Sequence, residues 1–163
     1  MNTTQCIRRL CCRLCNSSAL ELVIQLTPTP PANAFVKSNR VEVEQNVYPL
    51  DIFFCKNCSH VQLLDVIDPK ILFSEYVYVS GTSPLFVEHF RRYASDILTQ
   101  FTPRVGSLVV DIGSNDGTLL SFFKKAGMSV LGIDPARKIV EEANRNEIET
   151  LEGFFNPSLA EKI

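Results

Sequence analysis

A strand, a glycine-bracketed turn and a helix follow one another in residues 108–120 (LVVDIGSNDGTLL), and this succession constrains the fold more than any other stretch. Residues 108–110 form a short apolar run with β-branched side chains, which is typical of a strand covered on both faces. Gly113 and Gly117 bracket a polar loop that leads into an amphipathic segment. Such a loop directs backbone N–H groups and the positive end of a helix at its neighbour, so the sequence predicts a site for a nucleotide-like ligand here.

Helical and strand patterns alternate around this stretch. The spacing of apolar residues predicts a helix over 85–101, a second over 118–126, a buried strand over 129–133 that ends at Asp134, a helix with Pro135 in its first turn, and a third strand near 148–151. Because parallel strands need crossover connections, this order predicts an α/β fold with a doubly wound sheet and right-handed crossovers.

All the cysteines lie in the first 60 residues, and four of them form two C-x-x-C pairs, Cys12 with Cys15 and Cys55 with Cys58. The two-residue spacer lets both sulfur atoms of a pair reach one ion, and four thiolates suit a tetrahedral zinc site. The long separation between the pairs requires the intervening chain to loop out and return. Disulfides or plain buried thiols are the alternative, but a cytoplasmic chain favours metal over disulfides.

The segments around the two pairs agree with such a loop. Residues 27–31 (TPTPP) form a stiff extended piece, residues 41–54 read as a strand that leads into the second pair, and residues 59–64 read as the returning strand. Cys11 competes with Cys12 as a ligand, but only Cys12 gives the two-residue spacer. His60 is expected to be a structural or surface residue.

Composition and charge exclude several functional classes. The formal net charge is −2, with 21% charged residues, so no general attraction to nucleic acid or to an anionic membrane surface is expected. The sequence has no apolar run of membrane-spanning length, and its first residues have no apolar core of signal-peptide length. We therefore expect a cytoplasmic protein with neither nucleic acid nor membrane as a partner.

The glycine loop reads D-x-G-x-N-x-G from Asp111 to Gly117. Asn115 stands where a dinucleotide fingerprint has its middle glycine, and asparagine tolerates positive φ better than most residues. Asp111 and Asp116 repel a pyrophosphate but not a sulfonium cation, and Asp134 can accept both hydroxyl groups of a ribose. The pattern favours S-adenosylmethionine over a dinucleotide, and an acidic loop without a ligand is the alternative.

Together these motifs resemble the sugar C-methyltransferases of deoxysugar biosynthesis, which carry a zinc-binding N-terminal domain. The matching stretches are CRLC, TPTPPANAF, YPLDIFFCKNCSHVQL, LFSEYVYVSGTS with the following HF, VVDIGSNDGTLL and VLGIDPA, in the order of the family. The resemblance implies a small β-rich zinc-binding domain in residues 1–68 and a linker and helix in residues 69–105. Residues 106–163 would form the first part of a Rossmann-like methyltransferase domain that binds S-adenosylmethionine.

The resemblance also assigns roles to individual residues, and it implies a nucleotide-linked keto-deoxysugar as substrate. The zinc ligands would be Cys12, Cys15, Cys55 and Cys58, and the cofactor-binding residues Asp111, Gly113, Asn115, Gly117 and Asp134. Tyr76 and Tyr78 would face the active site, where a tyrosine hydroxyl can stabilise the oxyanion of the substrate enolate. Packing in the core or at an interface is the alternative for both tyrosines. His89 lies in the helical stretch 85–101, so we expect it to be a packed or surface residue rather than the base.

Members of this family are much longer than 163 residues. The family's fourth strand, its histidine and glutamate beside the reacting carbon, and its C-terminal domain would all lie beyond Ile163. We therefore expect the chain alone to bind zinc, to offer one wall of the cofactor site and not to turn over. A second polypeptide that supplies the remaining strands is a candidate partner, because strand 108–111 would be an edge. A non-enzymatic zinc-binding interaction module is the alternative function.

Overall fold

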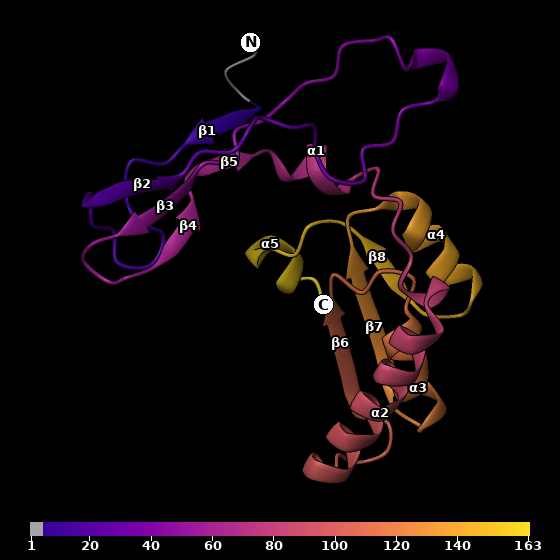
Figure 1. Cartoon of the computed structure of the whole chain (residues 1–163). Coiled ribbons are helices and arrows are strands. Elements are labelled where there is room, and N and C mark those ends of the chain that lie inside the picture. The colour runs from indigo at the N-terminus through magenta and orange to yellow at the C-terminus, as the bar shows by residue number, and fades with distance from the viewer. Residues whose placement is uncertain (1–4) are drawn as a thin grey trace. The chain divides into compact units, whose positions relative to one another are not determined.

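The structure is a computed structural model that describes residues 5–163. These residues fall into two compact units, the first up to Leu72 and the second Phe73–Ile163 (Figure 1). None of the helices in residues 5–163 combines the length and the apolar character that crossing a lipid bilayer requires.

The first unit is built from short antiparallel strands. In one sheet β1 (Cys6–Arg8) pairs with β5 (Asp65–Ile67). In the other, β2 (Leu20–Ile24), β3 (Ile52–Cys55) and β4 (Val61–Leu63) lie in the order β2-β3-β4. The 3-10 helix η1 (Ser38–Arg40) lies in the long connection between β2 and β3, and helix α1 (Pro69–Phe73) follows β5. The returning strand expected in residues 59–64 is confirmed as β4.

The strand expected over residues 41–54 is wrong in its first part, because only Ile52–Cys55 is a strand. The side chains of Val41, Val43 and Val47 are exposed, so the alternation of this stretch is not matched by a buried face. Tyr48 differs from these valines. It is buried and forms an isolated antiparallel bridge with Thr29 of the proline-rich segment.

The second unit begins with the 3-10 helix η2 (Ser80–Thr82) and helix α2 (Pro84–Phe101). Strands β6 (Leu108–Ile112), β7 (Ser129–Asp134) and β8 (Thr150–Glu152) then form a parallel sheet in the order β6-β7-β8. Helices α3 (Thr118–Lys125) and α4 (Arg137–Arg145) connect the strands, and α5 (Pro157–Ala160) follows the last strand. The α/β class, with strands and helices in the expected order, is confirmed.

The core of this unit lies on the helical face of the sheet. One cluster contains Phe123 and Ala94, and a second contains Leu120 and Ala143 with Ile148. Val109 and Val130 of the sheet pack against both clusters, so α2, α3 and α4 cover the same face, as Figure 1 shows. The helices α3 and α4 connect successive parallel strands in one direction along the sheet, and crossovers of the same hand then lie on the same face.

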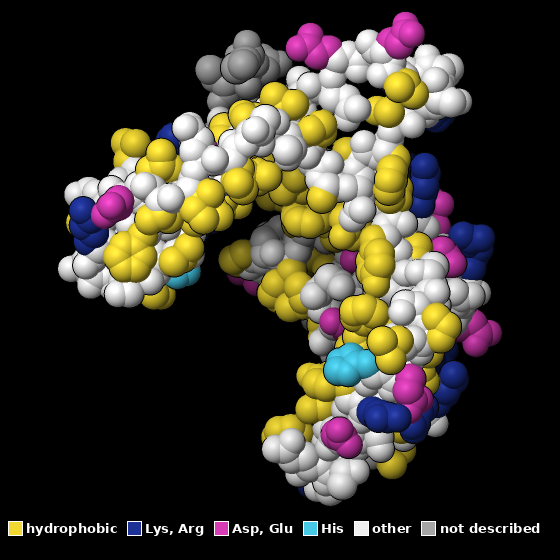
Figure 2. Space-filling view, in the orientation of Figure 1, with side chains coloured by type: hydrophobic (Ala, Val, Ile, Leu, Met, Phe, Trp, Pro, Cys, Tyr) yellow, Lys and Arg dark blue, Asp and Glu magenta, His cyan; other side chains and the backbone are white. Residues whose placement is uncertain are grey.

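The expectation that both faces of residues 108–110 are covered is wrong. In β6, Val109 is half-buried, whereas Leu108, Val110 and Ile112 are exposed on the other face. Figure 2 shows hydrophobic side chains at the surface of this unit. Within residues 5–163, β6 pairs only with β7 and therefore forms an edge of the sheet. The described helices thus cover only one face of β6, and the apolar side chains on its other face stay exposed.

Helix boundaries follow the local signals closely. Ser83 caps α2 through a hydrogen bond from the Phe86 N–H to its hydroxyl oxygen. Gly127, with φ +85°, follows the end of α3, where a left-handed residue commonly ends a helix. Pro135, however, lies outside the first turn of α4, because Ala136 occupies the N-cap. The third strand, β8, begins at Thr150, two residues later than expected.

Candidate functional site

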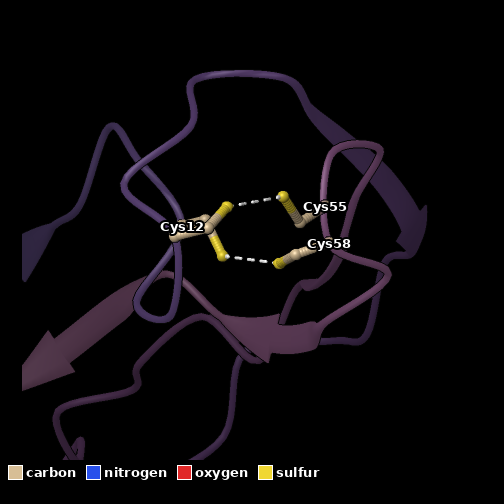
Figure 3. Close-up of side chains that lie close together, drawn as sticks. Cys12, Cys55 and Cys58 are labelled. Carbon is tan, nitrogen blue, oxygen red and sulfur yellow. Dashed lines mark hydrogen bonds between the residues drawn. The ribbon is translucent and has the colours of Figure 1, made fainter.

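Four cysteine sulfur atoms meet between the two C-x-x-C turns of the first unit. The ligand atoms of Cys12, Cys15, Cys55 and Cys58 all lie within 4.8 Å of one another. The Sγ atoms of Cys12 and Cys58 are 3.6 Å apart, as are those of Cys15 and Cys55 (Figure 3). A tetrahedral site with Zn–S bonds of about 2.3 Å requires sulfur atoms ~3.8 Å apart, so the cluster has the dimensions of a zinc site.

The two turns share one backbone conformation. In each, the residue after the second cysteine is left-handed, Asn16 with φ +58° and Ser59 with φ +62°. The N–H of that residue donates to the carbonyl of the first cysteine, over 3.1 Å to Cys12 and 2.8 Å to Cys55. This local closure, rather than packing alone, directs both sulfur atoms of a pair to the same point.

The electrostatics of the cluster favour a cation. Burial opposes ionisation of Cys12, but hydrogen bonds from the N–H groups of Cys15 and Leu14 and from the Gln62 side chain lower its pKa to about 6. The N–H of His60 favours the Cys58 thiolate, yet the neighbouring sulfur atoms and burial together raise the pKa of Cys58 to about 12. Cys12 therefore loses its proton easily, whereas Cys58 keeps its proton because a second negative charge would be repelled by the first. A divalent metal ion removes this repulsion between thiolates.

The remaining candidate ligands lie outside this group. Among the described residues, the group that could hold a metal ion does not include His60, Cys6 or Cys11. The carbonyl of His60 accepts the N–H of Cys55, so His60 helps to close the second turn through its backbone. Cys6 lies in β1 and is half-buried.

The glycine loop of the second unit depends on three left-handed residues, Gly113 (φ +80°), Asn115 (φ +52°) and Gly117 (φ +75°). At Gly117 a Cβ atom would lie 2.7 Å from Cγ2 of Ile148, so the helix start lies against the core with no room for a side chain. The left-handed conformation expected for Asn115 is thus present.

The expectation that the loop directs its backbone N–H groups outward is wrong for most of them. The N–H groups of Gly113 and Ser114 both donate to the carbonyl of Ile133, at 2.8 and 3.1 Å. The N–H of Gly117 donates to Ser114, and that of Thr118 donates to the Asp116 carboxylate. Since these donors are satisfied within the protein, the loop is a poor cradle for phosphate.

Asp134 is the residue that ties the loop to the sheet. Its carboxylate is buried, with one oxygen accepting the N–H of Asn115 at 3.0 Å and the other accepting the N–H of Ala136 at 2.8 Å. On the neighbouring strand, burial and the Asp134 charge raise the pKa of Asp111. Two carboxylates at the ends of adjacent strands create a negative potential that suits a cationic ligand.

The loop also holds the tyrosine segment. The Asn115 amide nitrogen donates to the carbonyl of Tyr78, and its oxygen accepts the N–H of Ser80, both at 2.9 Å. Beside it, the Asp116 carboxylate accepts the N–H of Gly81 at 2.8 Å. Asn115, considered from the sequence as a substitute for glycine, therefore acts with its side chain on a segment 35 residues earlier. The sequence carries one signal for this role, an amide side chain at a position where glycine would suffice.

The two tyrosines lie next to each other at this point. The ring centroids of Tyr76 and Tyr78 are 6.5 Å apart in an edge-on arrangement, and Phe73 packs against Tyr76 at 6.0 Å. The structure thus brings the tyrosine segment to the glycine loop. By contrast, His89 stacks on Tyr93 and contacts Phe90 within α2.

Comparisons with known proteins match the chain to a zinc-binding domain family and to a C-methyltransferase. Residues 12–73 match a family described as "Putative zinc binding domain". The chain is 32% identical over 152 residues to the C-methyltransferase NovU of Streptomyces niveus, in an alignment that covers 93% of this chain and 36% of NovU. The chain therefore spans about a third of the length of this curated relative.

A solved structure is also similar to part of the chain. It is that of a putative S-adenosyl-L-methionine-dependent methyltransferase from Methanococcus maripaludis, with 25% sequence identity and a TM-score of 0.41. The match covers 45% of this chain and 38% of that protein.

Proposed function

We propose that this chain is part of an S-adenosylmethionine-dependent C-methyltransferase. The proposal rests on its similarity to a C-methyltransferase and to a zinc-binding domain family, which agrees with the family expected from the sequence. Its first unit carries the zinc centre, and its second unit carries the strand–loop–helix against which the cofactor binds. The substrate is a nucleotide-linked keto-deoxysugar.

The observation that carries this proposal is a glycine loop whose backbone N–H groups are mostly hydrogen-bonded within the protein, next to two carboxylates. The N–H groups of Gly113 and Ser114 are occupied by the carbonyl of Ile133. Asp111 and Asp134 lie close enough for the charge of Asp134 to raise the pKa of Asp111. A loop of this kind disfavours phosphate and favours a sulfonium cation.

In this function, S-adenosylmethionine supplies an electrophilic methyl group on its sulfonium. The reaction needs a carbanion beside the sugar ketone, and the developing oxyanion needs hydrogen-bond donors. The hydroxyl groups of Tyr76 and Tyr78 are the donors that this chain offers, and Asn115 fixes the backbone that carries them. Each carboxylate oxygen of Asp134 accepts one backbone N–H, and its remaining lone pairs would accept the hydroxyl groups of the ribose. The protein mainly orients the two reactants.

The zinc centre has a structural role in this proposal. Four cysteine ligands leave no open coordination position for a substrate, which is typical of structural zinc sites. The metal joins two turns that lie 40 residues apart in sequence, Cys15 and Cys55, and so holds the small sheets of the first unit together.

The 163-residue chain alone binds zinc and does not transfer methyl groups. Support comes from the sheet edge at β6, because a doubly wound sheet binds its ligand where the strand order reverses. The described strands run in one direction only, from β6 to β8, so the second wall of such a crevice has to come from another segment or chain.

Two measurements test the proposal. Calorimetric titration of the zinc-loaded chain with S-adenosylmethionine and, separately, with ATP compares a sulfonium ligand with a phosphate ligand. We expect S-adenosylmethionine to bind more tightly, and preferential binding of ATP would contradict the sulfonium site. A methyl-transfer assay with a nucleotide-linked keto-sugar is expected to show no product until a polypeptide corresponding to the rest of a C-methyltransferase is added. Zinc binding without any response to S-adenosylmethionine, in either condition, would instead favour the non-enzymatic zinc-binding module.

A further inference from the structure

The strand β4 carries an inverted burial pattern that the cysteine ligands alone do not explain. Val61 and Leu63 are exposed, whereas the polar Gln62 between them is buried, with 7% of its surface accessible. A strand normally turns its apolar residues inward, and a buried amide is unfavourable unless its hydrogen bonds are made. The inward position of Gln62 therefore calls for specific partners.

Both ends of the Gln62 side chain have partners in the first C-x-x-C turn. Its oxygen accepts the backbone N–H of Arg13 at 2.8 Å, and its nitrogen donates to Sγ of Cys12 at 3.2 Å. The N–H of Arg13 can only donate, so it fixes the amide oxygen on its side and leaves the NH₂ group to face the sulfur atom. In the contact with Cys12, the Gln62 amide nitrogen is thus the donor and the sulfur atom is the acceptor.

The same contact links the two halves of the cluster. Gln62 follows the second turn by four residues and pairs across the sheet with Phe53 of β3, two residues before Cys55. Cys12 belongs to the other turn and is fully buried. The Arg13 side chain strengthens this link, because its Nε donates to the carbonyl of Leu63 at 3.0 Å.

We propose that Gln62 is a positioning residue of the zinc centre, which holds Cys12 in its ligating orientation through a hydrogen bond to the sulfur atom. Groups that contact a metal ligand from outside orient it and tune its donor strength, and their loss typically lowers metal affinity by about 10–100-fold. Asn57 makes a related but longer contact of 3.5 Å to Sγ of Cys15 from an exposed position. Because the Gln62 contact is buried and sheltered from water, it contributes more to metal affinity than the Asn57 contact does.

Two substitutions in the full 163-residue chain separate this role from simple packing. Gln62→Met preserves the size of the side chain and removes both hydrogen bonds. Gln62→Glu keeps an acceptor for the Arg13 N–H but places a carboxylate against the thiolate. Gln45→Glu, at an exposed position of the same unit, adds the same charge and serves as the matched control.

Zinc affinity is measured by competition with a chelator of known affinity. We expect Gln62→Glu to weaken binding by about 10–100-fold, Gln62→Met to weaken it less, and Gln45→Glu to leave it unchanged. If Gln62 serves only to anchor Arg13, the order reverses, because glutamate keeps that contact and methionine does not. Wild-type affinity in Gln62→Glu, or the reversed order, would overturn the proposal.

A spectroscopic measurement keeps the test independent of folding yield. In the Co²⁺-loaded protein, a hydrogen bond stabilises the sulfur lone pairs and raises the energy of the sulfur-to-cobalt charge-transfer band. We expect this band to move to longer wavelength in Gln62→Met and to stay in place in Gln45→Glu. An unshifted band in Gln62→Met would overturn the proposal, as would equal failure of both Gln62 variants to load metal.

Discussion

The side-chain oxygen of Asn115 accepts the backbone N–H of Ser80 at 2.9 Å, so the glycine loop and the tyrosine segment form one hydrogen-bonded structure. The same amide donates to the carbonyl of Tyr78 and thereby imitates a neighbouring β-strand. Under the proposed function, a ligand bound against the loop would therefore also restrain the backbone that carries Tyr78.

Replacing Asn115 with glycine tests this connection. Asn115→Gly keeps the left-handed conformation but removes both side-chain hydrogen bonds, each worth about 1 kcal/mol. We expect the Ser80 amide to exchange with solvent deuterium roughly fivefold to tenfold faster, as measured by NMR. Asn115→Asp retains the acceptor and should protect Ser80 better than glycine does. Equal protection of Ser80 in wild type and Asn115→Gly would contradict the connection.

Substitution at Gly117 should be far more harmful than at Gly106. Both glycines have positive φ, so alanine costs about 1 kcal/mol at either position. At Gly117 the new Cβ would also lie 2.7 Å from Ile148, whereas at Gly106 no described atom lies within 4 Å. We expect Gly117→Ala to destabilise the second unit by at least about 2 kcal/mol in urea unfolding, and Gly106→Ala by about half as much. Similar losses in the two variants would argue against tight packing at the loop.

Removal of zinc should affect one unit selectively. Chelation is expected to abolish amide protection in β3 and β4 while leaving that of β7 and α3 intact, because the cysteine cluster lies wholly within the first unit. Cys12→Ser should have the same effect as chelation. Cys11→Ser, at the adjacent residue outside the cluster, should retain one zinc per chain by elemental analysis. Loss of zinc from Cys11→Ser would mean that the ligand set includes Cys11.

The Asp111 carboxyl should make the stability of the second unit depend on pH. Burial and the charge of Asp134 raise its pKa in the folded state above the value of about 3.9 in an unfolded chain. The folded state therefore holds this proton more readily, and stability falls as the pH rises through the interval between the two pKa values. We expect Asp111→Asn to melt at a higher temperature than wild type at pH 7 and at the same temperature at pH 3.

The melting temperatures are measured by circular dichroism between pH 3 and pH 7. The variant Asp96→Asn, at an exposed position of α2, removes an equivalent charge and serves as the control. A lower melting temperature for Asp111→Asn at pH 7 would show that the carboxylate stabilises the fold. Under the proposed function, the same variant binds S-adenosylmethionine more weakly than wild type, since it loses a charge that attracts the sulfonium.

Patterns confined to a few consecutive residues carried most of the fold. The apolar spacing predicted the extents of α2 and α3 to within one residue at each end, because helical periodicity acts within a few turns. The cysteine cluster joins residues 40 positions apart, yet it was predicted because each C-x-x-C pair is local and a tetrahedral metal site needs both pairs. Pro135 was placed wrongly because α4 starts later, with Ala136 as its N-cap, and the N–H of Ala136 donates to the Asp134 carboxylate.

Features that depend on distant neighbours and have no such motif escaped prediction. Which faces of β6 are buried depends on the side of the sheet on which each connecting helix packs. The apolar composition of the strand does not indicate that side. The contacts of Asn115 with Tyr78 and of Gln62 with Cys12 join residues 37 and 50 positions apart. A polar residue flanked by exposed apolar ones, as at Gln62, is a signal for such a contact, but only the burial pattern reveals which face is inside.

The two C-x-x-C turns close a loop of 40 residues from Cys15 to Cys55. Lengthening a flexible loop is thermodynamically inexpensive, since doubling its length costs only about 0.6 kcal/mol of closure entropy. The connection that contains η1, with its exposed valines, can therefore accept inserted residues while the metal continues to hold both ends. This makes the interval between the turns a natural place for length variation, and a site where a tag or a reporter domain can be introduced without disturbing either unit.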